Sequence, residues 1–199
     1  AGTVLELVAA RNEYEPLLVV LKGPATYTAV SAVVPSTAIQ YRAARVGYVS
    51  VVNISDCDSL GPGSFPDPLI PDVDSYVGQT RNAFPVSVPQ DENRLLLIDL
   101  FVPPGTSPGS HIGSVTLTAT KGATKTLLFK LQVFGHTLPS TASMQSRYGM
   151  GQGQIFKGHH MSAFNDSAAA HQALYARYLE AGLMNRISGA DDRKNRSLI

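Results

Sequence analysis

The feature that most constrains the fold is a succession of short apolar stretches, many of them ended by glycine or proline, over the first two thirds of the chain. Most stretches alternate apolar and polar residues, the pattern of strands with one buried face. Tyr14–Leu21 is almost continuously apolar, which predicts a strand buried on both faces. The eight predicted strands are Val4–Ala9, Tyr14–Leu21, Tyr27–Val34, Val46–Ile54, Phe84–Val88, Leu95–Val102, His111–Thr120 and Leu127–Phe134.

Eight strands joined by turns rather than by helical patterns predict a mainly β fold, an antiparallel β-sandwich. Gly122 is expected at the hairpin turn between the last two strands. Ser55–Asn82 interrupts the series with a segment dense in Asp, Gly, Pro and Ser. We predict a long loop there, which is either functional or packed over the sheet.

The composition excludes several classes of protein. Among 199 residues, 44% are hydrophobic and 16% are charged, with a net charge of +1, so neither a disordered chain nor an electrostatic nucleic-acid binder is expected. No apolar run is long enough to span a membrane, and Ala1–Ala9 lacks the features of a signal peptide. The single cysteine, Cys57, excludes an internal disulfide.

The pattern changes after Pro139, so we predict a β-sandwich accessory domain over residues 1–139 and a second, incomplete domain over 140–199. The expected elements are a short strand within Gln145–Met150, a glycine-rich loop over Gly149–Gly158, a helix capped by Asp166 or Ser167 and running to Glu180, a stop at Gly182, and a strand within Leu183–Ser188. Helical spacing predicts a buried stripe of His171, Leu174, Tyr175, Tyr178 and Leu179. A lone βαβ unit cannot cover its own sheet, which indicates the first βα unit of a truncated (β/α) barrel.

Candidate sites of chemistry each have a simpler structural reading. The aspartates at 56, 58, 67, 72 and 74 offer oxygen ligands for calcium, but their spacing fits no EF-hand, and a solvated loop with Asx-turns is favoured. Asp91 and Glu92 are adjacent carboxylates, which tend to point in opposite directions on an extended chain, so a turn is favoured there.

The remaining candidates follow no established motif. His159, His160 and His171 are zinc-ligand types at an unfamiliar spacing, and Cys57 has no local signature of a nucleophile. Gly149–Gly153 lacks the lysine and hydroxyl residue of a phosphate loop. We therefore predict no catalytic residue, no cofactor and no metal site within this chain.

Four segments, in the same order, resemble phrases of the β-sandwich that precedes the barrel in glycoside hydrolase family 123. Ala9–Pro16 resembles the opening of that domain, and Phe65–Pro71 resembles its proline-flanked "P-D-P-L-x-P" stretch. Leu97–Pro103 followed by Pro108–Val115 is similar to its "W-V-D-V-Y-V-P … A-G-x-Y-x-G-x-V" hairpin, and Val133–Pro139 is similar to its exit phrase "V-W-D-F-T-L-P". Leu17–Leu18 and Phe134–Gly135 depart from the family pattern.

The resemblance implies a secreted or cell-surface, glycan-related parent protein, of hexosaminide or galactosaminide type. The family's catalytic carboxylates lie in the barrel, so no catalytic residue is carried over to this chain, which we expect to be inactive alone. Its expected partners are a glycan or the rest of its own barrel. Asn53, Asn165 and Asn195 each begin an N-glycosylation sequon, which suits an extracellular glycoprotein.

Three residues are expected to have structural roles. Glu13 stands at the entrance of a predicted strand, where a buried carboxylate needs donors, and we expect it to pair with Arg11 or Arg45. Asp67 lies in the second of the family-like segments, and Pro139 marks the predicted domain boundary.

Two other functions compete with the glycoside-hydrolase-like reading. The first is a structural or adhesive extracellular glycoprotein without activity, assembled with other chains. The second is an independent carbohydrate-binding module, which needs exposed aromatic platforms. That reading is disfavoured because tryptophan is absent and many of the seven phenylalanines and eight tyrosines occupy predicted core positions.

Overall fold

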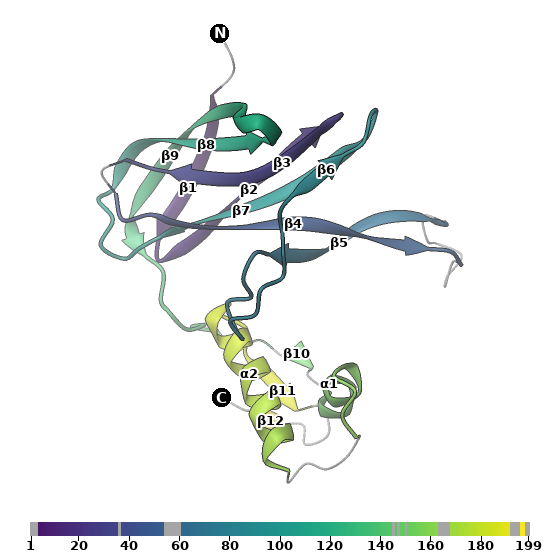
Figure 1. Ribbon diagram of the computed structural model, residues 1–199. Coiled ribbons are helices and arrows are strands. Elements are labelled where there is room, and N and C mark those ends of the chain that lie inside the picture. The colour runs from purple at the N-terminus through teal and green to yellow at the C-terminus, as the bar shows by residue number, and fades with distance from the viewer. Residues whose placement is uncertain are drawn as a thin grey trace. The chain divides into compact units, whose positions relative to one another are not determined.

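The chain divides into two compact units, Ala1–Leu138 and Pro139–Ile199 (Figure 1). The structure is a computed structural model that describes residues 4–35, 37–53, 61–144, 146, 148–149, 151–162, 168–191 and 196–197. Asp166, Ser167, Cys57, Asn165 and Asn195 lie outside the described residues. Each unit is considered by itself.

The first unit is mainly β, with two sheets. Its strands are β1 (Leu5–Arg11), β2 (Glu13–Lys22), β3 (Ala25–Val33), β4 (Gln40–Val51), β5 (Gly63–Pro71), β6 (Val86–Val88), β7 (Asn93–Val102), β8 (Gly109–Ala119) and β9 (Thr124–Thr137). One sheet has the order β1-β9-β8-β3-β6, and the other has the order β2-β7-β4-β5. All neighbouring pairs are antiparallel except β1 and β9, which run parallel.

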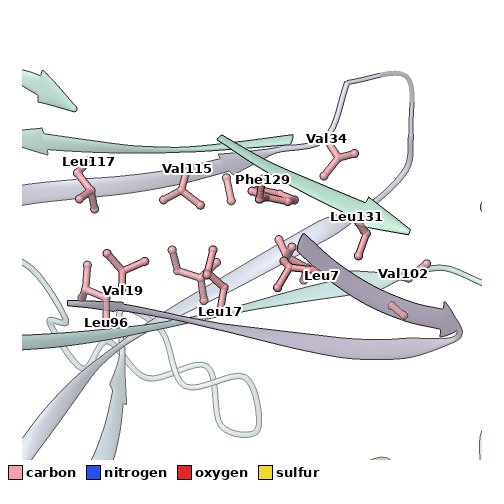
Figure 2. Packing of buried hydrophobic residues seen from close by; sticks show 14 of the residues in the cluster. Leu7, Leu17, Val19, Val34, Leu96, Val102, Val115, Leu117, Phe129 and Leu131 are labelled. Carbon is pink, nitrogen blue, oxygen red and sulfur yellow. The ribbon is translucent and has the colours of Figure 1, made fainter. Parts of the chain in front are cut away.

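The two sheets share one hydrophobic core. Strand β7 contributes every second residue, including Leu96, Ile98 and Val102, while β8 and β9 contribute Val115 and Phe129, all of them buried. Figure 2 shows labelled side chains of both sheets pointing into the space between them. Each fully buried aliphatic or aromatic side chain stabilises the fold by about 1.5–3 kcal/mol relative to exposure. In the strands with an alternating sequence, such as β8, the apolar residues therefore mark the face that forms the core.

One residue, Asn12, carries the chain from β1 in one sheet to β2 in the other. Its φ of 61° lies in the left-handed region, which asparagine tolerates better than most residues. The Asn12 backbone N–H donates to the Val102 carbonyl at 2.6 Å, and its side-chain amide donates to the Leu138 carbonyl at 2.9 Å. The Leu138 N–H in turn donates to the Arg11 carbonyl. This corner therefore holds the end of the first unit beside its first strand.

The expectation that Tyr14–Leu21 is buried on both faces is wrong. In β2 the side chains alternate: Leu17, Val19 and Leu21 are buried, whereas Leu18 and Val20 are 54% and 58% exposed. The described structure places only one face of this strand against the other sheet, because the four-stranded sheet has the shared core on one side alone.

The expectation of a continuous loop over Ser55–Asn82 is also wrong. Gly63–Pro71 forms β5, and Val73 and Thr80 form an isolated bridge beyond it. Three prolines argued against a strand, but β5 lies at the edge of its sheet, where a missing N–H leaves no partner unpaired. Asp67 and Pro68 stand opposite Gly47 in a β-bulge, where a side chain at Gly47 would collide with the Pro68 ring.

The second unit combines two helices with a small sheet. Its elements are β10 (Tyr148–Gly149), α1 (Gln152–Gly158), α2 (Ala169–Met184), β11 (Gly189–Asp191) and β12 (Arg196–Ser197), and the sheet order is β10-β11-β12. Strands β10 and β11 are parallel, with both helices between them in the sequence. Phe156 of α1 and Tyr175 of α2 are buried against each other, with Leu174 and Leu179 packed around them. His171 is buried as predicted, whereas Tyr178 is exposed.

Four local expectations for this unit are wrong. Much of the expected loop over Gly149–Gly158 is helix α1, and the N-cap position of α2 is Ala168, without a side-chain cap. Helix α2 continues through Gly182 to Met184, so the strand expected within Leu183–Ser188 is instead β11, from Gly189. Arg186, with φ 58°, takes the left-handed position that the sequence suggested for Gly182, and the Gly182 carbonyl accepts the N–H groups of Asn185 and Ile187.

No helix in the described part of the chain is long and apolar enough to cross a membrane.

Candidate functional site

A hollow of about 490 Å³ opens on the first unit, between strands β4, β5 and β7 and the segment that follows β5. Its lining is mostly apolar, with a few polar groups, as is typical of sites for small molecules. The residues that define its character are Tyr41, Arg42, Leu69, Tyr76, Phe84 and Asp99.

An ion pair between neighbouring strands forms one wall of the hollow. Arg42 of β4 and Asp99 of β7 are directly paired in the sheet, and Arg42 Nε donates to Asp99 Oδ2 at 2.9 Å. The Arg42 guanidinium also lies over the Tyr14 ring, 4.3 Å from its centroid, and the Tyr14 ring contacts that of Phe101 at 4.8 Å. Because it is held from two sides, the guanidinium is ordered before any ligand arrives.

Asp74 organises the segment that follows β5. The backbone N–H groups of Tyr76 and Val77 donate to Asp74 Oδ1 at 2.9 and 3.2 Å, and Arg81 Nη2 donates to Oδ2 at 3.3 Å. The hydrogen bond from the Tyr76 N–H is the main cause that holds the pKa of Asp74 below its ordinary value, and Val77 and Arg81 act in the same direction. This turn fixes the backbone of Tyr76 at the rim of the hollow.

Two tyrosines bring aromatic surface to the hollow. Tyr41 and Tyr76 both line it, and they are 41% and 44% exposed. The Tyr41 hydroxyl donates to the Val30 carbonyl of the other sheet at 3.3 Å, which anchors its ring. Tyr41 is paired with the buried Leu100, so its ring lies on the side of β4 that faces the other sheet, whereas the ion pair of Arg42 and Asp99 lies on the opposite side of the sheet. The Asp99 carboxylate already accepts a bond from Arg42, so it is placed to orient a ligand rather than to carry a transferable proton.

Glu13 takes a different partner from the one expected. Its Oε2 accepts a hydrogen bond from the Ala10 N–H at 2.5 Å, across the corner at Asn12. Arg11 and Arg45, the expected partners, donate instead to the carbonyls of Gly135 and Ala83. At a corner between two strands some backbone N–H groups have no partner in a sheet, and here the Glu13 carboxylate accepts the hydrogen bond of the Ala10 N–H. The pKa of the neighbouring Glu15 is raised, first by burial and second by the charge of Glu13.

The other structural candidates lie apart from the hollow's ion pair. Asp67 is exposed in the bulge of β5. Pro139 is the first residue of the second unit, and its carbonyl accepts a hydrogen bond from Arg186 Nε at 2.7 Å. Asn53 is exposed just after β4, and its use as a sequon stays a prediction.

The three histidines are not brought together. His159 Nε2 bonds to the Tyr178 hydroxyl at 2.8 Å, whereas His171 Nε2 bonds to the Ser162 carbonyl at 2.9 Å, with its ring edge against Phe156. Among the residues that the structure describes, no three His, Cys, Asp or Glu side chains are grouped as metal ligands. Asp91 occupies a turn with φ 61°, and Glu92 pairs with Arg94 at 2.6 Å. Glu180 is exposed on α2.

Apart from Asp72, which belongs to the aspartate-rich segment, the residues that define the hollow were not singled out by sequence reasoning. Arg42, Tyr41 and Tyr76 belong to no motif, and the sheet and the Asp74 turn bring them together from distant parts of the chain. One signal pointed to the place: Asp99 is the only charged residue in the apolar run from Leu95 to Val102. A charge within such a run needs a partner on a neighbouring strand.

No family model matches the chain, and no curated protein matches it. It is similar to a solved structure described as a family 123 glycoside hydrolase from Clostridium perfringens, studied for glycolipid glycan hydrolysis. The TM-score is 0.66 and the sequence identity is 14%, over 94% of this chain and 33% of that chain. The likeness shows a shared fold, and this chain corresponds to one third of that enzyme's length.

Proposed function

We propose that this chain is the non-catalytic β-sandwich portion of a secreted glycoside-hydrolase-like protein, followed by the first βα unit of its (β/α) barrel. The observation that carries the proposal is the fold likeness to a family 123 glycoside hydrolase, which extends over 94% of this chain. The parallel strands β10 and β11, separated by helices, support the assignment of residues 140–199 to the start of a barrel. The two sheets with one core support the accessory sandwich over residues 1–139.

In this proposal the parent protein acts on glycans of the hexosaminide or galactosaminide type, and its catalytic carboxylates belong to barrel strands beyond β11. Active sites of such barrels lie at the carboxyl ends of the strands and combine residues from several of them. The chain therefore supports and borders the site without completing it.

Hydrolysis assays test this proposal directly. The 199-residue chain and the longer parent protein are incubated with aryl hexosaminides and aryl galactosides. We expect turnover by the parent protein and none by the chain. Turnover by the chain that disappears in Asp191→Asn or Asp192→Asn would refute the non-catalytic role, because in the sequence these two carboxylates stand at and directly after the last residue of β11.

Limited proteolysis tests the boundary at Pro139. We expect a protected fragment of roughly residues 1 to 140, because strand backbones within a sheet resist cleavage. Faster cutting inside β7 or β9 than at residues 150–165 would contradict the two-domain assignment.

The secreted location is also a proposal, and the exposed position of Asn53 after β4 supports it. When the protein passes through a eukaryotic secretory pathway, we expect its mass to fall after enzymatic removal of N-glycans and the loss to shrink in Asn53→Gln. A secreted product that carries no N-glycan would leave the sequons without a role. A parent protein that is glycosylated but lacks hydrolytic activity would favour the structural or adhesive alternative.

A further inference from the structure

We propose that the hollow between β4, β5 and β7 binds one neutral pyranose ring of a glycan, as a subsite outside the barrel. This inference rests on the proposed function, because it takes the parent protein's ligand to be a glycan. It assigns to the β-sheet unit a binding role of its own.

The size and lining of the hollow fit a sugar ring. Its volume of about 490 Å³ lies within the range of small-molecule sites. A pyranose has faces of C–H groups and a rim of hydroxyl groups, so it requires both apolar contact and polar partners. The hollow combines Leu69, Leu97 and Tyr76 with the ion pair of Arg42 and Asp99.

Tyr76 supplies the aromatic contact for one face of the ring. The face of an aromatic ring carries partial negative charge, which attracts the partially positive C–H groups of a pyranose. The backbone of Tyr76 is held by Asp74. Since this backbone is positioned before binding, less conformational entropy is lost when a ligand arrives. Tyr76 thus provides aromatic surface in a chain that contains no tryptophan.

The ion pair supplies both kinds of hydrogen-bonding group that a hydroxyl needs. Arg42 has five N–H donors, and its Nε–H is directed to Asp99. The carboxylate of Asp99 accepts that bond and has further acceptor positions. A sugar hydroxyl can donate to a carboxylate and accept from a guanidinium. The pair therefore matches adjacent hydroxyls of one ring.

The charge of the hollow favours a neutral sugar. Its lining contains one basic residue, Arg42, which is already paired, against the two carboxylates of Asp72 and Asp99. A uronic or sialic acid would place a third carboxylate among them without an unpaired cation in the lining. Neutral hexoses and N-acetylhexosamines avoid that repulsion.

The test is an NMR titration of the 199-residue chain with the methyl glycosides of galactose, N-acetylgalactosamine and glucuronic acid. We expect saturable shifts of the amides of residues 41–44, 69–76 and 97–99 with at least one neutral sugar, at a Kd of about 1 mM or weaker. We expect at least tenfold weaker binding of the glucuronide. Shifts that map elsewhere, or no saturable binding, would overturn the inference.

Matched variants show whether the named side chains are responsible. Tyr76→Ala and Arg42→Lys are expected to weaken binding at least fivefold, whereas Tyr76→Phe retains the ring and the affinity. Tyr48→Ala is the control, since Tyr48 is an exposed tyrosine of the same strand β4 that lies outside the hollow. Dispersed amide spectra of each variant establish that it is folded. Unchanged affinity in folded Tyr76→Ala and Arg42→Lys would refute the site.

This outcome is separable from that of the proposed function. If the parent protein hydrolyses glycans while the hollow binds no sugar, the proposed function stands and the subsite is refuted. If the hollow binds a neutral sugar and the parent protein has no turnover, the subsite stands and the hydrolytic assignment is refuted.

Discussion

The ring of Phe129 occupies the space that a side chain at Gly113 would need. The two residues are directly paired between β8 and β9, and a Cβ atom built on Gly113 would collide with the Phe129 ring. Phe129 is among the largest fully buried side chains of the core. A strand glycine ordinarily weakens a sheet, but here its bare backbone lets an aromatic ring lie flat across the neighbouring strand.

Gly113→Ala is therefore expected to destabilise the first unit by about 1–3 kcal/mol, because Phe129 has to move within a close-packed core. Urea unfolding followed by circular dichroism measures the change. Gly135→Ala is the matched control in β9, since nothing lies within 4 Å of the position of its Cβ. If both alanine variants unfold at the same urea concentration as the unsubstituted chain, the packing argument is wrong.

Glu15→Gln is expected to stabilise the protein at neutral pH. Burial and the charge of Glu13 raise the pKa of Glu15, so its ionised form is less favourable in the folded chain than in the unfolded chain. The protonated form of Glu15 costs the folded chain no stability, and this form prevails below the pKa that Glu15 has in the unfolded chain. As the pH rises through the higher pKa of Glu15 in the folded chain, the free energy of unfolding falls. The advantage of the glutamine should thus be small below a pH of about 4 and larger at pH 7. Melting temperatures across this range measure it.

Asp67→Asn is the control for that measurement, because Asp67 is exposed in the bulge of β5. The melting temperature of Asp67→Asn should equal that of the unsubstituted chain at every pH. A glutamine variant whose advantage does not grow with pH would contradict the assignment of the raised pKa to Glu15.

Asp74→Ala is expected to loosen the turn beside the hollow. Because the pKa of Asp74 is lowered in the folded chain, its carboxylate stabilises the turn at any pH above the pKa that Asp74 has in the unfolded chain. This stabilisation is lost as the pH falls through the lower pKa of the folded chain. In the variant, the amides of Tyr76 and Val77 lose their acceptor and should exchange with solvent faster, as NMR exchange rates would show. The amide of Leu131, in the core of β9, is the internal control. Unchanged exchange at Tyr76 would disprove this role of the carboxylate.

Two substitutions at Asn12 separate backbone strain from side-chain bonding. Asn12→Gly keeps the left-handed conformation accessible but loses the bond to the Leu138 carbonyl, at a cost of about 0.5–1.5 kcal/mol. Asn12→Ala also forces an ordinary residue to φ 61°, which adds about 1–2 kcal/mol. In denaturant unfolding, the unsubstituted chain should therefore be the most stable, Asn12→Gly the second and Asn12→Ala the least stable. An alanine variant as stable as the glycine variant would exclude strain at this corner.

The sequence predicts most of the strands because their inward side chains alternate with polar or small ones. It predicts less well where two causes give the same pattern. Leu18 and Val20 are apolar although they lie on the outer face of β2, so the run looked like a doubly buried strand. The prolines of β5 read as loop residues, since the pattern alone does not reveal that the strand lies at a sheet edge.

The candidate site was less predictable than the strands. Its ion pair depends on the register of β4 against β7, which places Arg42 opposite Asp99 across 57 positions of sequence. The position of Tyr76 depends on the Asp74 turn, where the sequence indicated Asx-turns in general but not which residue they would present. Long-range register and loop placement are set by the whole fold rather than by local pattern.

The parallel pairing of β1 with β9 gives the first unit a mechanical property. Tension applied to the chain before Leu5 and after Thr137 would pull these two strands past each other along their length. Their ladder, from Leu5 opposite Phe129 to Arg11 opposite Thr137, would then bear the load at many hydrogen bonds at once, whereas a hairpin pulled open loses them one by one. The Arg11 bond to the Gly135 carbonyl adds a further link in the same place. The first unit can therefore hold its two ends together when they are pulled apart.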